Sequence, residues 1–261
     1  MTLVQNPLRV PDYLPTGKER ALFLTSRGTI VVELFGLDAA HTVGNFIELA
    51  QSGFYDGLKF HAYKEGSVVA GGCPVTRNLG PAQVHAAVRG VLHGIHPGTG
   101  DAGYCIADEW EQNARNRHLN GSLAMAHGSA ANSASCQFYF SLATQPEFDK
   151  QFTVFGQAVD VWDPAWDLLL EPTCEPTLVS SCESTLESSC EPVNNSACES
   201  TCEFTARFVA TDDSDASHIA AVSDSSKATK SDTDRSNSCE SLNVVHSLRI
   251  GDTIKRIVIV K

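Results

Sequence analysis

Short runs of apolar residues, separated by Gly, Asn and Pro, dominate the chain up to about residue 160. The runs 21–25 and 29–35 are rich in β-branched residues, and Ser26-Arg27-Gly28 between them is typical of a hairpin turn. The final run, 254–260, alternates as a strand at the border of a core does. Five further runs are predicted to be strands on the same grounds: 59–63, 68–70, 122–126, 137–142 and 153–159.

One segment has helical rather than strand periodicity. Within 42–53, the apolar residues Val43, Phe46, Ile47 and Ala50 follow the spacing i, i+3, i+4, i+7, and the segment ends in a glycine. Many short strands with few helices predict a mainly β fold, a closed antiparallel barrel that is capped by helices.

Charge is concentrated in one part of the sequence. The whole chain carries a net charge of −12, and residues 164–242 contribute 15 acidic against 4 basic residues. The rest of the chain is close to neutral, so it has no basic field to hold phosphates. We therefore expect no nucleic acid among the partners.

The same acidic segment contains a tandem octapeptide whose four copies each start with Cys-Glu, the first at Cys174 and the last at Cys198. Eight residues with at most one large apolar side chain cannot stack into a solenoid, and the stretch 211–241 is rich in Ser, Asp and Lys. These features predict a disordered, low-complexity insertion. The alternative is a thiol ladder that binds a soft cation, although structural zinc sites favour closer pairs such as Cys198 and Cys202. We expect no metal and no cofactor.

The first 18 residues have no apolar run behind a basic start, so they do not predict a secretory signal. No stretch approaches 18 apolar residues, so we expect no contact with a membrane. Nine cysteines in a chain without an export signal favour reduced thiols, and hence a cytoplasmic protein.

Eight collinear stretches of the chain together form a specific pattern. They are GTIVVELF (28–35), HTVGNFIELAQSGFYDGLKFH (41–61), GG (71–72), ADE (107–109), NGSLAMAH (120–127), SCQFYF (135–140), EFDKQFTVFGQAV (147–159) and NVVHSLRIGDTIKRIVIV (243–260). In this order they resemble the cyclophilin family. The resemblance covers roughly residues 20–160 and 243–261, and it implies an eight-stranded antiparallel β-barrel, closed and capped by two α-helices, the second near 243–249.

Collinearity also places the insertion. We divide the chain into an N-terminal tail (1–19), the first part of the barrel (20–163), the acidic insertion (164–242), and the last helix and strand of the barrel (243–261). A long loop costs little because closure entropy grows only with the logarithm of loop length. The barrel is therefore expected to fold around the insertion.

The activity that this resemblance implies is peptidyl-prolyl cis-trans isomerisation. Rotation about an X-Pro bond must overcome a barrier of about 18–20 kcal/mol set by amide resonance. A site accelerates the rotation by binding the twisted amide better than either planar isomer, without a nucleophile, metal or cofactor. In cyclophilins an apolar pocket holds the proline ring, and an Arg donates a hydrogen bond to the prolyl nitrogen.

The resemblance also implies that the polar part of this site is eroded. Where the family has Phe-His-Arg this chain has Phe60-His-Ala, so Ala62 stands at the Arg position, and Ala70 stands at the position of a Gln. Losing one preorganised donor in a dry site costs on the order of 10²–10³ in rate. Lys64 shares a strand face with Ala62 but is a more distant point charge, and Arg89 is the other cation considered as a substitute.

The apolar part of the site is expected to persist. Ser67 stands at the position of a pocket Phe, while Tyr139 replaces the Phe of the pocket floor. We predict Ala62, Phe60 and Gln137 at the catalytic positions, and as substrate-binding residues Val68, Ala70, Met125, Ala126, His127, Tyr139, Phe148 and Phe152.

These residues predict a cytoplasmic, monomeric peptidyl-prolyl cis-trans isomerase of the cyclophilin type with reduced activity. It would assist protein folding, as a chaperone does, by acting on proline-containing peptides or unfolded proteins. The alternative is a catalytically inactive module that binds proline-containing peptides or serves as a scaffold. The Arg-to-Ala change at Ala62, together with Ala70, is what separates the two hypotheses.

Overall fold

The computed structural model describes residues 6–166, 169 and 240–261. The described residues belong to one compact unit. Most of the predicted insertion, including the Cys octapeptide, lies outside them. No helix of the described part is long and apolar enough to cross a lipid bilayer.

Eight antiparallel strands form a single sheet in the order β3-β4-β6-β5-β7-β2-β1-β8. Each of the eight predicted strands is confirmed, since every one overlaps an observed strand. The strands are β1 (Arg20–Thr25), β2 (Thr29–Leu34), β3 (Ala62–Lys64), β4 (Val68–Gly71), β5 (Ser122–Met125), β6 (Phe138–Ser141), β7 (Val154–Ala158) and β8 (Ile254–Val260).

The sheet is not a closed barrel, which corrects the prediction. β3 and β8 are its two edges, and the strands curl into a half-barrel. The edges approach each other through the segments that precede them: Lys59 pairs with Thr253 in an isolated bridge, and the Phe60 N–H donates to the carbonyl of Asp252 at 2.9 Å. Lys59 and Phe60, predicted to begin the third strand, make these contacts instead, and β3 is only three residues long.

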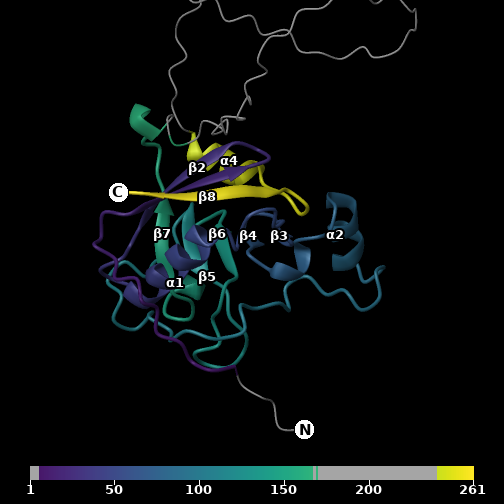
Figure 1. Cartoon of the computed structure of the whole chain (residues 1–261), viewed down its shortest axis with the longest axis horizontal. Coiled ribbons are helices and arrows are strands. Elements are labelled where there is room, and N and C mark those ends of the chain that lie inside the picture. Colours follow the sequence, from purple (N-terminus) through teal and green to yellow (C-terminus); the bar gives the residue numbers. More distant parts are fainter. Residues whose placement is uncertain (1–5, 167–168, 170–239) are drawn as a thin grey trace, which may run out of the picture. The chain divides into compact units, whose positions relative to one another are not determined.

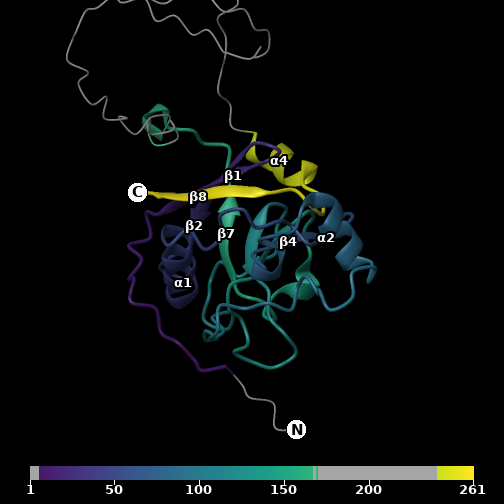
Figure 2. The ribbon, with the colours of Figure 1, turned by 45° about the vertical axis from the view of Figure 1, so that its right-hand side comes forward.

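Three helices lie among the described residues, where two were predicted: α1 (Ala40–Gln51), α2 (Pro81–Val88) and α4 (Ser241–Ser247). In Figures 1 and 2, α1 and α4 lie on opposite sides of β8, while α2 stands beside the β3–β4 end of the sheet. The predicted helices correspond to α1 and α4. The additional helix, α2, starts at a Gly-Pro step, and Pro81 occupies its first turn without losing a hydrogen bond.

The N-terminus of α1 is capped by a side chain from a distant loop. Ala39, at the N-cap position, makes no side-chain bond. The Glu109 carboxylate instead accepts hydrogen bonds from the backbone N–H of His41 at 3.0 Å and from the N–H and hydroxyl of Thr42, both at 2.7 Å. A carboxylate at this end also interacts favourably with the helix dipole.

The main core lies between α1, α4 and one face of the sheet. The ring centroid of Phe46 on α1 is 5.7 Å from that of Phe23 on β1 and 6.1 Å from that of Phe138 on β6. Val245 of α4 is fully buried in the same cluster. Because side chains alternate along a strand, the residues between these core positions face the opposite side of the sheet. That opposite face carries the candidate site.

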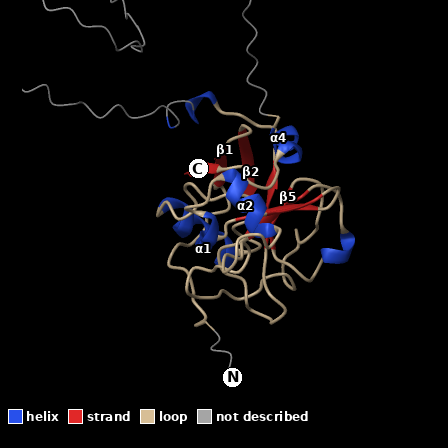
Figure 3. Cartoon of the chain, turned by 90° about the vertical axis from the view of Figure 1, so that its right-hand side faces the viewer, coloured by secondary structure: helices blue, strands red, loops and turns tan. Residues whose placement is uncertain are grey.

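Residues 89–121, between α2 and β5, contain no helix and no strand. Much of the described chain is loop, which is drawn in tan in Figure 3. The loop runs beside the candidate site and supplies part of its walls, as described below. Its backbone is held by isolated bonds, such as those that join Cys105 to Leu8 and Ile106 to Ala134.

Candidate active site

Strand register brings five of the small and aromatic side chains into one row. Ala62 on β3 pairs with Ala70 on β4, Ala70 pairs with Tyr139 on β6, and Tyr139 pairs with Ala124 on β5. Ala124 in turn pairs with Val154 on β7. Residues directly opposite each other on neighbouring strands share a face. The row therefore places Ala62 on the face that carries Tyr139, two strands away.

An apolar cluster of side chains surrounds Tyr139 on this face, at the place of the predicted proline slot, and we keep the name slot for it. Tyr139, Phe148 and Phe152 form an aromatic trio with ring centroids 5.6 to 6.4 Å apart. The slot is completed by smaller side chains: Tyr139, Ala124 and Val154 pack with Phe35, Val68, Ala70, Ala126 and Phe152. Of the predicted substrate-binding residues, the structure thus brings together Val68, Ala70, Ala126, Tyr139, Phe148 and Phe152.

Two predicted site residues lie elsewhere. Phe60 and Met125 are fully buried in the main core, and the Phe60 ring packs edge-on against Phe138 with centroids 6.4 Å apart. Met125 follows Ala124 in β5, so alternation turns it to the opposite face of the sheet. The structure thus places Phe60, predicted at a catalytic position, and Met125, predicted to bind substrate, in the main core and not beside Tyr139.

Ser67 also differs from the expectation that it stands at the slot wall. It is buried, and its hydroxyl donates to Oε1 of Gln145 at 3.0 Å. Gln145 in turn donates from Nε2 to the carbonyl of Ser67. This reciprocal pair ties the β3–β4 turn to the segment that leads to Phe148.

A chain of hydrogen bonds that the sequence did not reveal lies behind the slot. The Tyr139 hydroxyl is 2.9 Å from Nε2 of His118, and Nδ1 of His118 is 3.0 Å from the Asp149 carboxylate. The His118 side chain has no exposed surface. Burial lowers the pKa of His118, against the opposing effect of Asp149, and raises the pKa of Tyr139. With Asp149 accepting from Nδ1–H, a neutral His118 accepts at Nε2 a hydrogen bond that the Tyr139 hydroxyl donates.

Gln137 and His127 line a cavity of about 500 Å³ that lies next to the slot. We call it the second cavity, to distinguish it from the slot. Nε2 of Gln137 donates to the carbonyls of Gly98 at 2.9 Å and Gly100 at 2.8 Å, so its amide holds the 98–100 loop in place. The His127 ring stacks near Phe152, with centroids 4.6 Å apart. Ala126 belongs to both the slot and this cavity, which makes the two adjacent.

None of the cations considered as substitutes for the missing Arg is placed in the slot. Lys64 lies two residues from Ala62 on β3, opposite Val68, with an exposed side chain. Arg89 is an exposed residue at the C-terminal end of α2. His61 is buried beneath Gly98, and burial lowers its pKa to about 4, against a smaller opposing effect of Gln137. His61 is therefore neutral near pH 7 and supplies no positive charge beside Ala62.

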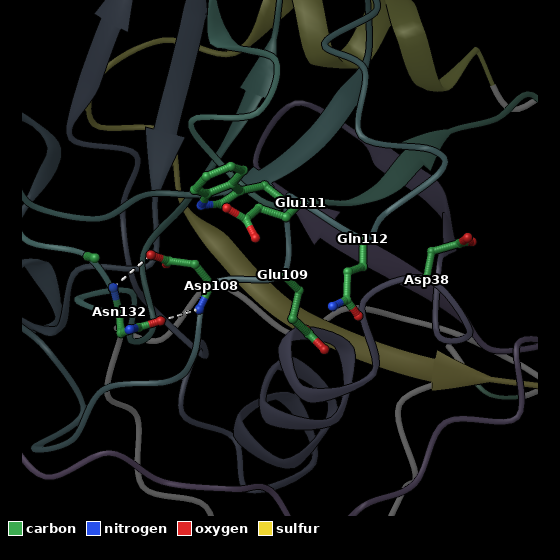
Figure 4. Close-up of a pocket in the computed structure, with 8 residues that line it drawn as sticks. Asp38, Asp108, Glu109, Glu111, Gln112 and Asn132 are labelled. Carbon is green, nitrogen blue, oxygen red and sulfur yellow. Dashed lines mark hydrogen bonds between the residues drawn. The ribbon is translucent and has the colours of Figure 1, made fainter.

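A separate cavity of about 390 Å³ has acidic walls (Figure 4). It lies at the N-terminus of α1, and its Glu109 carboxylate is the helix cap described above. Asp108 exchanges two hydrogen bonds with Asn132, at 2.8 and 2.6 Å. Glu109 thus holds its loop against the N-terminus of α1, and Asp108 holds the same loop against Asn132. Within the described residues, no group of three or more His, Cys, Asp or Glu side chains is arranged to hold a metal ion.

Comparison with known proteins decides the family. The model of the family described as cyclophilin type peptidyl-prolyl cis-trans isomerase/CLD matches residues 21–168, more than half of the chain. The chain belongs to this family. Relatives are found among bacterial enzymes: the peptidyl-prolyl cis-trans isomerase of Synechococcus elongatus is 39% identical over 54% of this chain and 81% of its own length. Peptidyl-prolyl cis-trans isomerase B of Bacillus subtilis is also 39% identical, over 52% of this chain and 80% of its own.

Among solved structures, the cyclophilin-type isomerase of Cryptosporidium parvum, studied in the presence of the dipeptide Ala-Pro, is 23% identical. The match covers 55% of this chain and 80% of the Cryptosporidium parvum chain, with a TM-score of 0.44. The row of residues around Tyr139 lies entirely within the segment that matches the family of cyclophilin-type isomerases.

Proposed function

We propose that this cyclophilin-type domain binds proline-containing peptides or unfolded chains with the proline ring in the slot over Tyr139, and isomerises the X-Pro bond with reduced turnover. The observation that supports binding is the aromatic trio of Tyr139, Phe148 and Phe152, which lies beside the small, half-buried side chains of Ala70 and Ala126. An aromatic, apolar surface suits a pyrrolidine ring because contact with it buries apolar surface without leaving a polar group unpaired.

We expect reduced turnover because of Ala62 and Ala70, which lie at the β3–β4 end of the row of residues that contains Tyr139. Ala62 and Ala70 are directly paired and both half-buried, so two methyl groups occupy the positions at which the resemblance implies Arg and Gln. A methyl group cannot donate to a prolyl nitrogen as its lone pair localises, and neutral His61 does not compensate. The same observation favours the second candidate function, a module that binds proline-containing peptides without catalysis.

Restoring the donor tests the proposal. Ala62→Arg with Ala70→Gln should raise kcat/KM for a short X-Pro peptide at least about tenfold, which is about 1.4 kcal/mol of transition-state stabilisation. Ala62 lies on the edge strand β3, so a longer side chain can extend along the row without displacing the core. Uncatalysed exchange takes tens to hundreds of seconds, so low rates can be measured by a protease-coupled assay or by NMR exchange.

The matched control is Ala62→Met with Ala70→Gln, which adds length without a cation. An equal gain in both variants would show that packing, not the donor, limits the rate. A folded Arg variant with no gain would show that the slot does not position the X-Pro bond, and the binding-module function would then hold.

We further propose that the protein is a monomer of the cytoplasm. Cys73, Cys105 and Cys136 are unpaired and buried, and burial raises the pKa of Cys136 to about 12, so this thiol stays protonated. Unpaired thiols support a reducing compartment.

A further inference from the structure

The described part of the predicted N-terminal tail runs along the loop that walls the second cavity. The Cys105 N–H donates to the carbonyl of Pro7 at 2.9 Å, and the Arg9 N–H donates to the carbonyl of Cys105 at 2.8 Å. Leu8 and Cys105 therefore form a parallel bridge. Two backbone bonds on either side of one residue fix both the position and the direction of this segment.

Side chains fasten the same segment to α1. The Arg9 guanidinium lies 2.8 Å from the Glu48 carboxylate and donates to the Tyr104 hydroxyl at 3.1 Å. Glu48 also accepts from the backbone N–H groups of Asp12 and Tyr13, at 2.6 and 2.8 Å. Several charge-assisted bonds share one carboxylate, which makes the placement of residues 6–13 a property of the fold and not of one contact.

This placement brings Asn6 to the second cavity. Asn6 lines the cavity, and its Nδ2 donates to Oδ2 of Asp101 at 2.8 Å. The other oxygen of Asp101 accepts from the Gly103 N–H at 2.7 Å. A carboxylate offers about four acceptor sites, so two remain for a ligand. Asp101 is exposed, and the neighbouring walls are polar: Ser133, Ser135 and Gln137.

The cavity lies about two residue lengths from the slot. Gln137, just before β6, precedes Tyr139 by two residues, which is about 7 Å of extended chain. An extended ligand covers the same length with two residues. A ligand residue two positions from a proline seated over Tyr139 therefore reaches the cavity that Asp101 and Asn6 wall.

We propose that the N-terminal segment 6–9 and Asp101 form a specificity wall of the peptide-binding site, and that this wall selects a cationic side chain, Lys or Arg, two residues from the proline. The proposal rests on the proposed function, because it requires a proline in the slot. Asp101 supplies the charge, and Asn6 orients the carboxylate by its hydrogen bond. The cavity, at about 500 Å³, has room for a long side chain.

Fluorescence anisotropy with labelled single-proline peptides tests the wall on the full chain at 150 mM salt. The peptides carry Lys, norleucine or Glu two positions from the proline, in one set before it and in another after it. In one of the two sets the wild type should bind the Lys peptide at least tenfold more tightly than the Glu peptide. Asp101→Asn should bring that ratio to within about twofold of unity while norleucine peptides still bind.

Two further variants separate this wall from the general acidity of the chain. Asn6→Leu removes the bond to Asp101 and should lower the Lys-to-Glu ratio severalfold, while Asp160→Asn removes an exposed carboxylate that does not line the cavity and should leave the ratio unchanged. A ratio that survives Asp101→Asn would overturn the role of Asp101, and one that survives Asn6→Leu would overturn that of the N-terminal segment. Binding of every peptide without preference would contradict the specificity wall but not the proposed function. Absence of all peptide binding would contradict the proposed function itself.

Discussion

At the scale of single residues, the position of Tyr139, the proposed floor of the slot, depends on a hydrogen bond to His118 behind it. The Tyr139 hydroxyl reaches His118, whose ring lies 5.8 Å from Phe148 and 6.0 Å from Tyr139, centroid to centroid. His118 therefore packs against two slot aromatics while its two nitrogens are occupied by Tyr139 and Asp149. The orientation of Tyr139 is set by a buried polar network as well as by packing.

Removing the Tyr139 hydroxyl should reveal this network. Tyr139→Phe leaves Nε2 of the fully buried His118 without its partner, so the free energy of unfolding should fall by about 1–3 kcal/mol. Denaturant unfolding measures this. The double variant Tyr139→Phe, His118→Phe removes both polar partners and should recover part of the loss. If Tyr139→Phe is as stable as the wild type, the network contributes nothing to the fold.

At the scale of elements, helix α1 is completed by a residue from the long loop. Glu109→Ala removes the three hydrogen bonds and the charge at the N-terminus of α1, so we expect the free energy of unfolding to fall by about 1–2 kcal/mol. Hydrogen exchange of the first turn of α1 should accelerate as well. Glu111→Ala, which alters an exposed carboxylate of the same loop, is the matched control. Equal effects of both variants would refute a capping role for Glu109.

The strands and α1 were predictable because one rule, the period of apolar residues, decides them. That β3 and β8 do not pair with each other could not be predicted, because the alternation of residues within each strand does not say whether the two edges of the sheet meet. Helix α2 has only Val84 and Ala87 buried, so its apolar pattern is too weak to read. Its signals were the Gly-Pro start and the glycine after its end, at Gly90.

The candidate site was predictable where it follows register and alternation. Val68, Ala70 and Tyr139 share a face by position, and the same alternation applied to Ala124 and Ala126 would have turned Met125 toward the core. His118 was not predictable, because it lies 21 residues from Tyr139 on a loop whose path no local pattern specifies. Asn6 was missed for a similar reason, since its contact with Asp101 spans 95 residues.

At the scale of the whole molecule, helix α4 is attached to the sheet by its first residue, Ser241. The Ser241 hydroxyl donates to the carbonyl of Val159 at 2.8 Å and accepts from the N–H of Val31 at 3.0 Å. The chain thus returns to the end of β7 and to β2 before β8 begins. The two hydrogen bonds hold Ser241 beside Val31 and Val159, whatever the number of residues between positions 159 and 241.

The insertion itself should be dispensable for folding. Replacing residues 168–238 with a short Gly/Ser linker, with Ser241 retained, should leave Tm within a few degrees, because the composition of the insertion offers no apolar periodicity to pack. Adding Ser241→Ala to the shortened chain should lower Tm, since Val31 and Val159 then lose their partner. Collapse of soluble expression in the shortened chain would mean that the segment packs on the barrel. The expectation that the Cys octapeptide holds no metal stays a prediction.

The pairing of β1 with β8 has a consequence for synthesis on the ribosome. Arg20 of β1 pairs with Val260, so one side of β1 stays unpaired until β8 has been synthesised. Trp166 and Ile254 are 88 positions apart, which at about 5–20 residues per second is roughly 4–18 s of translation. During this time β1 has β2 on one side and a bare row of backbone donors and acceptors on the other, the condition in which nascent strands pair wrongly. A longer insertion costs the finished fold little, but it lengthens the time for which the growing chain depends on whatever shields that edge.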